Sequence, residues 1–391
     1  MSRRLINRSP DLKRLEDEGY EVSVRGAHLL VGHVPYRNAD GVVAFGTLAS
    51  TLELSGDVTV KPNDHVAHFI GGVPHGGDGA PLSKILHTVG KQTLTGDLVS
   101  DCSFSSKPLG GAGYANYHQK MTTYARMIAE PAHVLDGDVT ARTFPVIRAE
   151  DEESVFHYID TASSRAGIAA LTEKLKISKI AIVGLGGTGS YILDFLAKTP
   201  IDEIHLFDED DFLQHNAFRS PSAPSFQELE EHLKKVEHFA RLYSKMRRGI
   251  VAHPYNVVEE NVEELRPFDF VFLTAESSEA KAFIPGKLIA FGVPFVDVGM
   301  GLYEEGALGG ILRATTITPA RSGHAGTRIS SGGGVDDPYA QNIQIVELNA
   351  LNAALAVIKW KKLLGFYRDE EAEHNTLYVI GGNTLINGEA A

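Results

Sequence analysis

Residues 180–189 read Ile-Ala-Ile-Val-Gly-Leu-Gly-Gly-Thr-Gly, an apolar β-branched run that breaks into a glycine-rich turn. A helical pattern follows at 190–198. Because glycine has no Cβ, the chain can turn tightly and bring backbone N–H groups and the positive end of a helix against a phosphate. The glycines of the turn are Gly184, Gly186, Gly187 and Gly189. The segment predicts a strand, a phosphate loop and a helix of an α/β nucleotide-binding fold. The alternative is a glycine turn that binds no nucleotide.

A second strand is predicted at 203–207, and it ends in Asp208, about 20 residues past the loop, where a Rossmann unit places a ribose-binding carboxylate. This pattern fits NAD as well as ATP. Asp210, Asn216, Arg219 and the pair 234–235, Lys-Lys, come next. A triphosphate needs such donors and cations along its length, so the spacing favours ATP over an NAD-dependent oxidoreductase. Thermal-shift assays with the two nucleotides would separate these interpretations.

The segment 179–235 resembles the adenylation domain of the ThiF/MoeB/HesA family, whose fold is shared with ubiquitin-activating enzymes. The motifs that carry this resemblance are a GxGGxG loop at 184–189, a strand ending in Asp208, and the Asn-x-x-Arg of Asn216 and Arg219. The resemblance implies a Rossmann-like α/β domain with a mixed sheet that continues to the C-terminus. It also implies a role in a bacterial ubiquitin-like conjugation pathway.

The resemblance also implies roles for individual residues. The loop glycines would cradle the phosphates, Asp208 and Asp210 would bind the cofactor, and Asn216, Arg219 and Lys235 would contact the phosphate chain. Lys234 is a near-equal choice for the last role. The family places an arginine from an upstream helix into the ATP site of a partner subunit, and Arg165, in the segment 161–168, stands where that helix is expected.

The sequence departs from the family pattern after the fourth strand. The family has a Thr-Asp pair there, whose Asp handles Mg²⁺ and the reacting carboxylate, whereas this chain has Thr274, Ala275 and Glu276. Glu276 is the candidate catalytic and metal-binding carboxylate, because Mg²⁺ needs only one or two carboxylates besides phosphate oxygens. The alternative is a solvated glutamate at the end of a strand.

Cysteine usage is the second departure. Family members that form a thioester carry a nucleophilic Cys after this half-domain, but the single Cys of the chain, Cys102, lies upstream of the nucleotide-binding segment. The stretch 313–341 offers hydroxyls that could accept an acyl group as an oxyester, although a hydroxyl is a poor nucleophile without a base. These hydroxyls belong to Ser322, Thr327, Ser330 and Ser331. Cys102 is either the acyl acceptor of a fused domain of ubiquitin-conjugation type or a small buried apolar residue.

A domain boundary is predicted at 135–155, where an acidic run interrupts the hydrophobic pattern. It separates a smaller α+β domain at 1–145 from the adenylation domain at 155–391. The first domain is expected to contain helices at 11–18 and 116–129 and strands at 21–24, 28–31, 41–49 and 58–60. Its histidines at 65, 68 and 75 either bind a metal or hydrogen-bond the backbone of a glycine-rich turn. In the second domain a helix is expected at 259–265, strands at 268–273, 292–299 and 309–313, and a long apolar helix at 343–366.

The chain has 391 residues and a formal net charge of −13, which counts against a nucleic-acid partner. It contains no apolar run approaching ~20 residues and no secretory signal, so we expect no membrane span and a cytoplasmic location. An arginine that enters a partner's site requires two-fold assembly, and the resemblance places a dimer helix near 343–366, so a homodimer is expected.

The expected reaction is attack of a substrate carboxylate on the α-phosphate of Mg·ATP, with positioning and cationic stabilisation as the protein's task. The expected substrate is the C-terminal carboxylate of a ubiquitin-like protein. One alternative is a small peptide or other carboxylate adenylated for amide or cyclic product formation. Another is a non-catalytic scaffold that binds ATP.

Overall fold

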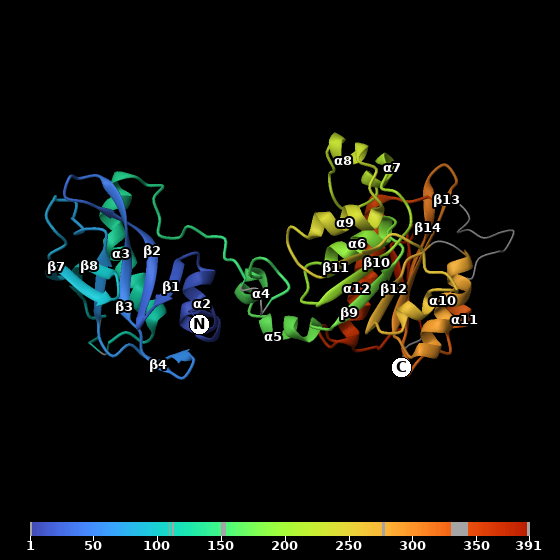
Figure 1. Ribbon diagram of the computed structural model, residues 1–391, viewed down its shortest axis with the longest axis horizontal. Coiled ribbons are helices and arrows are strands. Elements are labelled where there is room, and N and C mark those ends of the chain that lie inside the picture. The colour runs from blue at the N-terminus through green and yellow to red at the C-terminus, as the bar shows by residue number, and fades with distance from the viewer. Residues whose placement is uncertain are drawn as a thin grey trace. The chain divides into compact units, whose positions relative to one another are not determined.

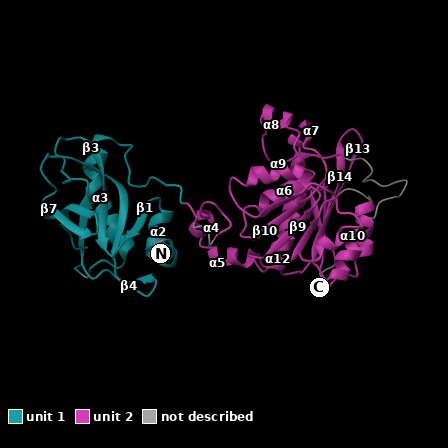
Figure 2. Ribbon diagram, viewed as in Figure 1, with its two compact units in different colours: residues 1–147 teal, residues 148–391 magenta. Residues whose placement is uncertain are grey.

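The chain divides into two compact units, residues 1–147 and 148–391, which are described separately (Figure 2). The structure is a computed structural model that describes residues 2–108, 110–111, 113–149, 154–275, 278–329 and 343–388. The division falls inside the stretch 135–155 in which the acidic run lies.

The first unit is an antiparallel sheet with helices packed on it (Figure 1). Its six strands follow the order β1-β2-β3-β6-β8-β7, and all of the paired neighbours run antiparallel. The strands are β1 (Glu21–Arg25), β2 (His28–Arg37), β3 (Val43–Thr51), β6 (Val66–Ile70), β7 (Leu86–Thr95) and β8 (Leu98–Ser105). A small hairpin joins β4 (Leu54–Ser55) to β5 (Val58–Thr59). The helices are α1 (Ser2–Arg8), α2 (Pro10–Asp17) and α3 (Tyr117–Leu135).

Helix α3 provides one side of the first unit's core. Asn116 caps it, because its side-chain oxygen accepts a hydrogen bond from the Gln119 N–H at 2.9 Å. Tyr117, Met121 and Tyr124 recur at helical spacing and are fully buried, and the helix packs against β2 and β3.

The second unit contains a mixed eight-stranded sheet in the order β11-β10-β9-β12-β13-β14-β15-β16. The strands β11, β10, β9, β12 and β13 run parallel, and β14, β15 and β16 continue the sheet antiparallel. The parallel strands are β9 (Lys179–Val183), β10 (Glu203–Phe207), β11 (Ile250–His253), β12 (Phe270–Leu273) and β13 (Phe295–Glu304). The others are β14 (Leu308–Ile317), β15 (Asn375–Val379) and β16 (Thr384–Gly388). The predicted α/β fold with a mixed sheet, preceded by a smaller α+β domain, is confirmed.

Helices cover both faces of this sheet (Figure 1). On one face, α6 (Gly187–Leu196) and α12 (Val346–Leu363) pack together, and their core includes Ile180, Ile182 and Trp360. On the other face, the core includes Ala181, Val183 and residues of α10 (Ser278–Phe291). The alternation of neighbouring residues between the two cores is the two-residue period of a strand buried on both faces.

Short helices complete the second unit. They are α4 (Thr161–Arg165), α5 (Ala169–Thr172), η1 (Glu173–Leu175), α7 (Gln214–Ala217), α8 (Phe226–Glu230), α9 (Lys235–Tyr243), η2 (Val262–Leu265) and α11 (Ala325–Arg328). The helix predicted at 259–265 is thus only a 3₁₀ turn. The Asn261 side chain accepts from the Val258 N–H and donates to the Asn256 carbonyl, which favours a turn before it.

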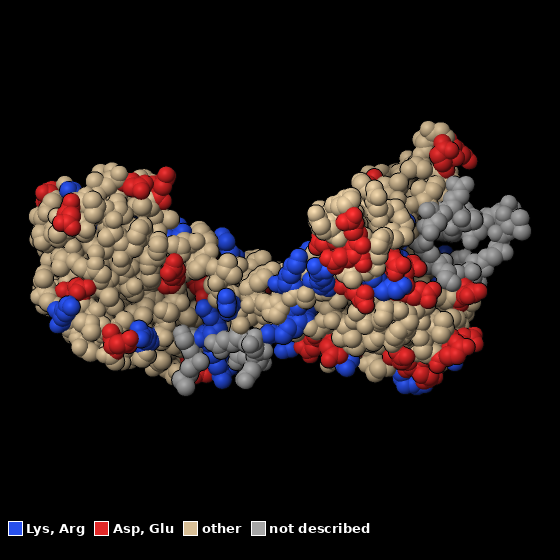
Figure 3. Space-filling view, turned by 45° about the horizontal axis from the view of Figure 1, so that its top comes forward, with Lys and Arg blue, Asp and Glu red and all other residues tan. Residues whose placement is uncertain are grey.

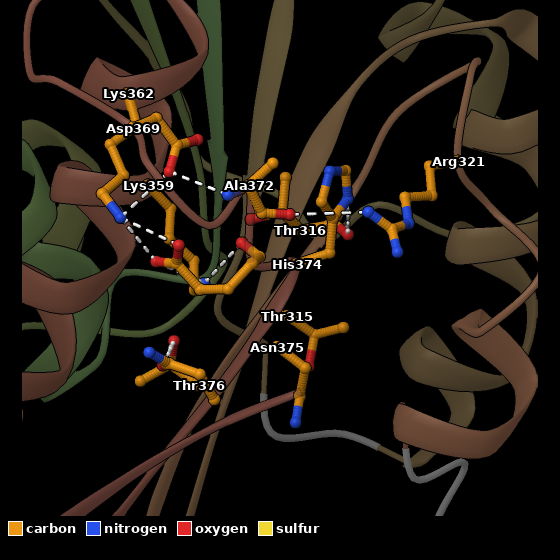
Figure 4. Close-up of polar contacts among 12 residues, drawn as sticks. Thr315, Thr316, Arg321, Lys359, Lys362, Asp369, Ala372, His374, Asn375 and Thr376 are labelled. Carbon is orange, nitrogen blue, oxygen red and sulfur yellow. Dashed lines mark hydrogen bonds and ion pairs between the residues drawn. The ribbon is translucent and has the colours of Figure 1, made fainter. Parts of the chain in front are cut away.

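An ion-paired cluster attaches the segment before β15 to the end of α12 (Figure 4). Lys362 Nζ donates to both carboxylate oxygens of Glu373 at 2.8 Å, and Lys359 Nζ donates to the Glu373 carbonyl at 3.1 Å. Lys359 is only 4% exposed, and burial lowers the pKa of its ammonium to about 8.

The charge on the surface and the length of the helices are relevant to nucleic-acid and membrane partners. On the face drawn in Figure 3, acidic side chains are spread over the second unit, and basic side chains gather at one end of it. Of the helices in the described ranges, none combines the length and apolarity needed to cross a bilayer.

Candidate functional site

The glycine loop lies between the end of β9 and the start of α6, at the carboxyl edge of the parallel strands. Gly184 has φ +95, and a Cβ on it would lie 2.8 Å from the Ala275 nitrogen after β12. A Cβ on Gly189 would lie 2.1 Å from the Gly184 carbonyl oxygen. Side chains are therefore excluded at both positions, and the backbone itself lines the mouth of the loop.

Helix α6 presents its amino end to this loop. Gly186 is its N-cap, with φ −68 and ψ −158. Because glycine has no side chain, this residue makes no capping hydrogen bond to the first amides of the helix. The Gly187 N–H donates to Gln344 Oε1 at 3.2 Å. Backbone amides and the helix dipole at a helix amino end form the kind of arrangement that binds phosphate.

Three of the predicted cofactor residues lie together at the end of β10. Asp208 is buried; its Oδ2 accepts from the Leu185 N–H at 2.6 Å and its Oδ1 accepts from the Asp210 N–H at 2.9 Å. Lys235 Nζ donates to Asp210 Oδ2 at 2.5 Å and lies 3.5 Å from Asp208 Oδ1. The loop, the β10 carboxylate and a buried cation are thus directly connected.

Lys234 points elsewhere, although it precedes Lys235 in the chain. Its Nζ pairs with Asp211 Oδ1 at 2.8 Å and donates to the Glu209 carbonyl at 2.9 Å. Its side chain is 41% exposed, whereas the side chain of Lys235 is buried. The geometry therefore favours Lys235 as the phosphate-binding lysine.

Asn216 and Arg219 lie in and just after α7. Asn216 is buried, and its Oδ1 accepts from the Leu213 N–H at 2.8 Å, which holds the start of the helix. Arg219 Nε is buried and has no hydrogen-bond partner among the described residues. A buried guanidinium N–H without a partner is costly, and a bound phosphate oxygen would satisfy it.

The structure adds Asn349 of α12, which the sequence analysis missed. This side chain is fully buried; its Oδ1 accepts from Thr188 Oγ1 at 3.2 Å, and its Nδ2 donates to the Arg219 carbonyl at 3.3 Å. It therefore links the glycine loop to the segment that carries Arg219. The available signal was an asparagine within a helical pattern rich in apolar residues.

Thr274, after β12, is a second structural support of the loop. Its hydroxyl donates to the Val183 carbonyl at 3.0 Å and to the Gly184 carbonyl at 2.5 Å. Glu276, the candidate catalytic and metal-binding carboxylate, lies outside the described residues, as do Ser330 and Ser331. No group of three or more metal-ligating side chains occurs in the part of the chain that the structure describes, so the histidines at 65, 68 and 75 form no such cluster there.

The remaining candidates lie on other elements. Arg165 is exposed at the end of α4, whose first amides are capped by Asp160. Cys102 is in β8 of the first unit, is 1% exposed, and lies 3.8 Å from the Gly72 carbonyl oxygen. Burial raises the pKa of its thiol to about 12. These surroundings are those of a small apolar core residue, and we do not propose Cys102 as an acyl acceptor.

Comparison with known families also divides the chain in two, with the boundary at residue 161. Residues 161–320 match the ThiF family, and residues 10–161 match a domain of unknown function, DUF6791. The second unit carries a ThiF family domain.

A relative is the ubiquitin-like modifier-activating enzyme 5 of Drosophila mojavensis, which is 29% identical over 138 residues, 32% of this chain and 34% of the relative. The match thus spans about a third of that relative's length. A similar solved structure is E. coli MccB with MccA-N7isoASN, at 16% identity and a TM-score of 0.48, covering 58% of this chain and 69% of the other. Another is PaaA, at 17% identity and a TM-score of 0.43, covering 56% and 75%.

Proposed function

We propose that this chain is an ATP-dependent adenylating enzyme. The observation that carries the proposal is the site of the ThiF family domain, where a glycine loop and a helix amino end meet a buried carboxylate and two cations. The loop would hold the phosphates, Asp208 the ribose, and Arg219 and Lys235 the phosphate chain. This arrangement supports ATP binding.

The proposed reaction needs no protein nucleophile. A substrate carboxylate oxygen bonds to the α-phosphorus, the bond from that phosphorus to the oxygen bridging to the β-phosphate breaks, and pyrophosphate leaves with the electron pair. Negative charge accumulates on phosphate oxygens, and Arg219 and Lys235 would stabilise it. We propose that Glu276 holds Mg²⁺, which would add a further positive charge.

We further propose that the substrate is the C-terminal carboxylate of a ubiquitin-like protein. The support is the similarity of part of this chain to a ubiquitin-like modifier-activating enzyme. We also propose a homodimer in which Arg165 enters the partner's ATP site. The cytoplasmic location stays a prediction.

The proposal is tested by ATP–pyrophosphate exchange with purified protein and a panel of ubiquitin-like proteins and peptides. Substrate-dependent exchange is expected, and Arg219→Ala should reduce it about 100-fold, since one group of this kind contributes ~3 kcal/mol to a transition state. The matched control is Arg241→Ala, an arginine of α9 that is 55% exposed and pairs with Glu231. Exchange unaffected by Arg219→Ala would overturn the assignment. Tight ATP binding without exchange would identify a scaffold, and exchange only with peptides would identify a peptide substrate.

A further inference from the structure

A cavity of about 350 Å³ lies on the second unit among helices α6, α8 and α9 (Figure 1). The glycine loop, Asp208, Arg219 and Lys235 do not belong to its lining. Its volume falls in the range of pockets that hold small molecules. Apolar side chains supply much of the wall, and they belong to Pro221, Ala223, Pro224, Leu233 and Leu242. The cavity is therefore a candidate site for a second ligand, separate from the nucleotide.

Two charged residues of the lining are already neutralised by neighbours. Both carboxylate oxygens of Asp194 accept from Lys198 Nζ, at 2.8 and 2.7 Å, and Asp194 Oδ1 also accepts from the Tyr243 hydroxyl at 3.0 Å. Arg241 Nη1 donates to Glu231 Oε2. Neither Asp194 nor Arg241 is thus left as an unpaired charge for a ligand.

Two opposite charges of the lining remain, Glu228 of α8 and Lys245 just after α9. Glu228 Oε2 accepts from the Ser225 N–H at 2.7 Å, but neither Glu228 nor Lys245 forms an ion pair with any residue that the structure describes. The hydrogen bond from the Ser225 N–H lowers the pKa of Glu228, and the nearby ammonium of Lys245 lowers it further. The two charges are thus close without touching. They are complementary to a ligand that carries one ammonium and one carboxylate.

The wall also contains a polar group that its own chain leaves unsatisfied. His238 lines the cavity, is 7% exposed and stacks on Phe212 with the ring centroids 3.9 Å apart. Its Nε2 is buried and has no hydrogen-bond partner among the described residues. Burial lowers the pKa of this ring, so it is largely neutral at pH 7. Because buried polar atoms are normally hydrogen-bonded, an unsatisfied one in a cavity wall favours a binding role for the cavity.

The loop over the cavity has an unusual backbone. Ser222 has φ +128, a region that residues with a side chain rarely adopt, and such strain is concentrated at ligand-binding and active sites. Pro221 and Pro224 restrict the same loop, so little ordering remains to be done when a ligand binds. The loop directly follows the segment of Arg219, and the helix that carries His238 begins at Lys235. The cavity is thus connected through the chain to both cations of the nucleotide site.

We propose that this cavity binds a free amino acid with an apolar side chain and that its occupancy changes the affinity for ATP. The ligand's carboxylate pairs with Lys245, its ammonium pairs with Glu228, and its side chain packs on the proline and leucine wall. By linkage, ATP changes the affinity for the amino acid by the same factor. The binding site does not depend on the proposed function, whereas the coupling rests on it through ATP.

The test is calorimetric titration of the full chain with L-leucine and L-phenylalanine, one aliphatic and one aromatic amino acid. At least one of them should bind. Its N-acetyl derivative lacks the ammonium, and its amide lacks the carboxylate. Each derivative should bind about tenfold more weakly, the size expected when a hydrogen bond between charged groups is lost.

Two variants assign these differences to residues. In Lys245→Met the free amino acid and its amide should bind equally. In Glu228→Gln the free amino acid and its N-acetyl derivative should bind equally, while the new side chain still accepts from the Ser225 N–H. The matched control is Lys287→Met, an exposed lysine of α10 outside the cavity, which should keep both differences. Thermal unfolding identifies any loss that comes from misfolding.

The binding site would be overturned if neither amino acid bound, if the three forms bound wild-type protein equally, or if the differences survived in the two variants. The coupling is measured by ATP titration with and without saturating amino acid, and a change of about fivefold or more is expected. Unchanged ATP affinity would remove the coupling and keep the site. Absence of pyrophosphate exchange with every substrate would end the proposed function and leave amino-acid binding in place.

Discussion

At the residue scale, Gly187 is the loop position at which a side chain has least room. A Cβ there would lie 1.9 Å from Asn349 Nδ2 and 2.7 Å from Gln344 Oε1. We predict that Gly187→Ala displaces Asn349, destabilises the fold by about 1–3 kcal/mol and weakens ATP binding at least tenfold. Urea unfolding and calorimetric ATP titration measure the two effects. The control is Gly286→Ala in α10, where a Cβ meets nothing within 4 Å, and unchanged ATP affinity in Gly187→Ala would contradict the prediction.

Cys102 gives a second prediction for a single residue. Because burial raises the pKa of the thiol to about 12, almost no thiolate exists at pH 8. Iodoacetamide should therefore leave the native protein unmodified and label it once urea has unfolded it. Cys102→Ser should keep substrate-dependent exchange. Rapid labelling of the native thiol would restore Cys102 as an acyl-acceptor candidate.

At the element scale, the end of α12 carries a pH-dependent contribution to stability. The pKa of Lys359 falls from 10.5 to about 8 in the folded chain because its ammonium is buried. Between these values the unfolded chain binds more protons than the folded chain, so the free energy of unfolding should rise with pH from about 8 to 10.5. We predict a rise of ~2 kcal/mol relative to Lys359→Met, in which Lys362 still pairs with Glu373. Urea unfolding across this range checks it, and parallel pH profiles for the two proteins would refute it.

The elements also show what the sequence could predict. The strand at 203–207 and the glycine loop are as expected, because an apolar run and a glycine turn are local signals. Strand β7 was missed because most of its residues are exposed and no alternation marks it. Its place depends on pairing with β8.

The residues of the site also divide into those marked by a local sequence signal and those brought there by tertiary packing. Asp208, Asp210 and Lys235 follow from spacing within one segment, and the structure brings them together. Asn349 comes from helix α12, which is distant in sequence from the glycine loop, so only tertiary packing could reveal it.

At the scale of the whole molecule, each unit has its own hydrophobic core. One set of core clusters lies within residues 5–141, and the other lies within 175–360. Since buried apolar surface is the main source of cooperativity, separate cores imply separate unfolding units. We therefore predict two thermal transitions for the full chain.

ATP should move only one of these transitions, because the glycine loop, Asp208 and Arg219 all belong to the second unit. At 100 times its Kd, ATP would stabilise that unit by about 2.7 kcal/mol, which is a shift of about 5–10 °C for a unit of this size. Differential scanning calorimetry with and without ATP measures both transitions, and the Arg219→Ala variant should show a smaller shift at the same ATP concentration. A single transition that ATP moves as a whole would mean that the two cores unfold together, and the first unit would then contribute to the stability of the nucleotide site.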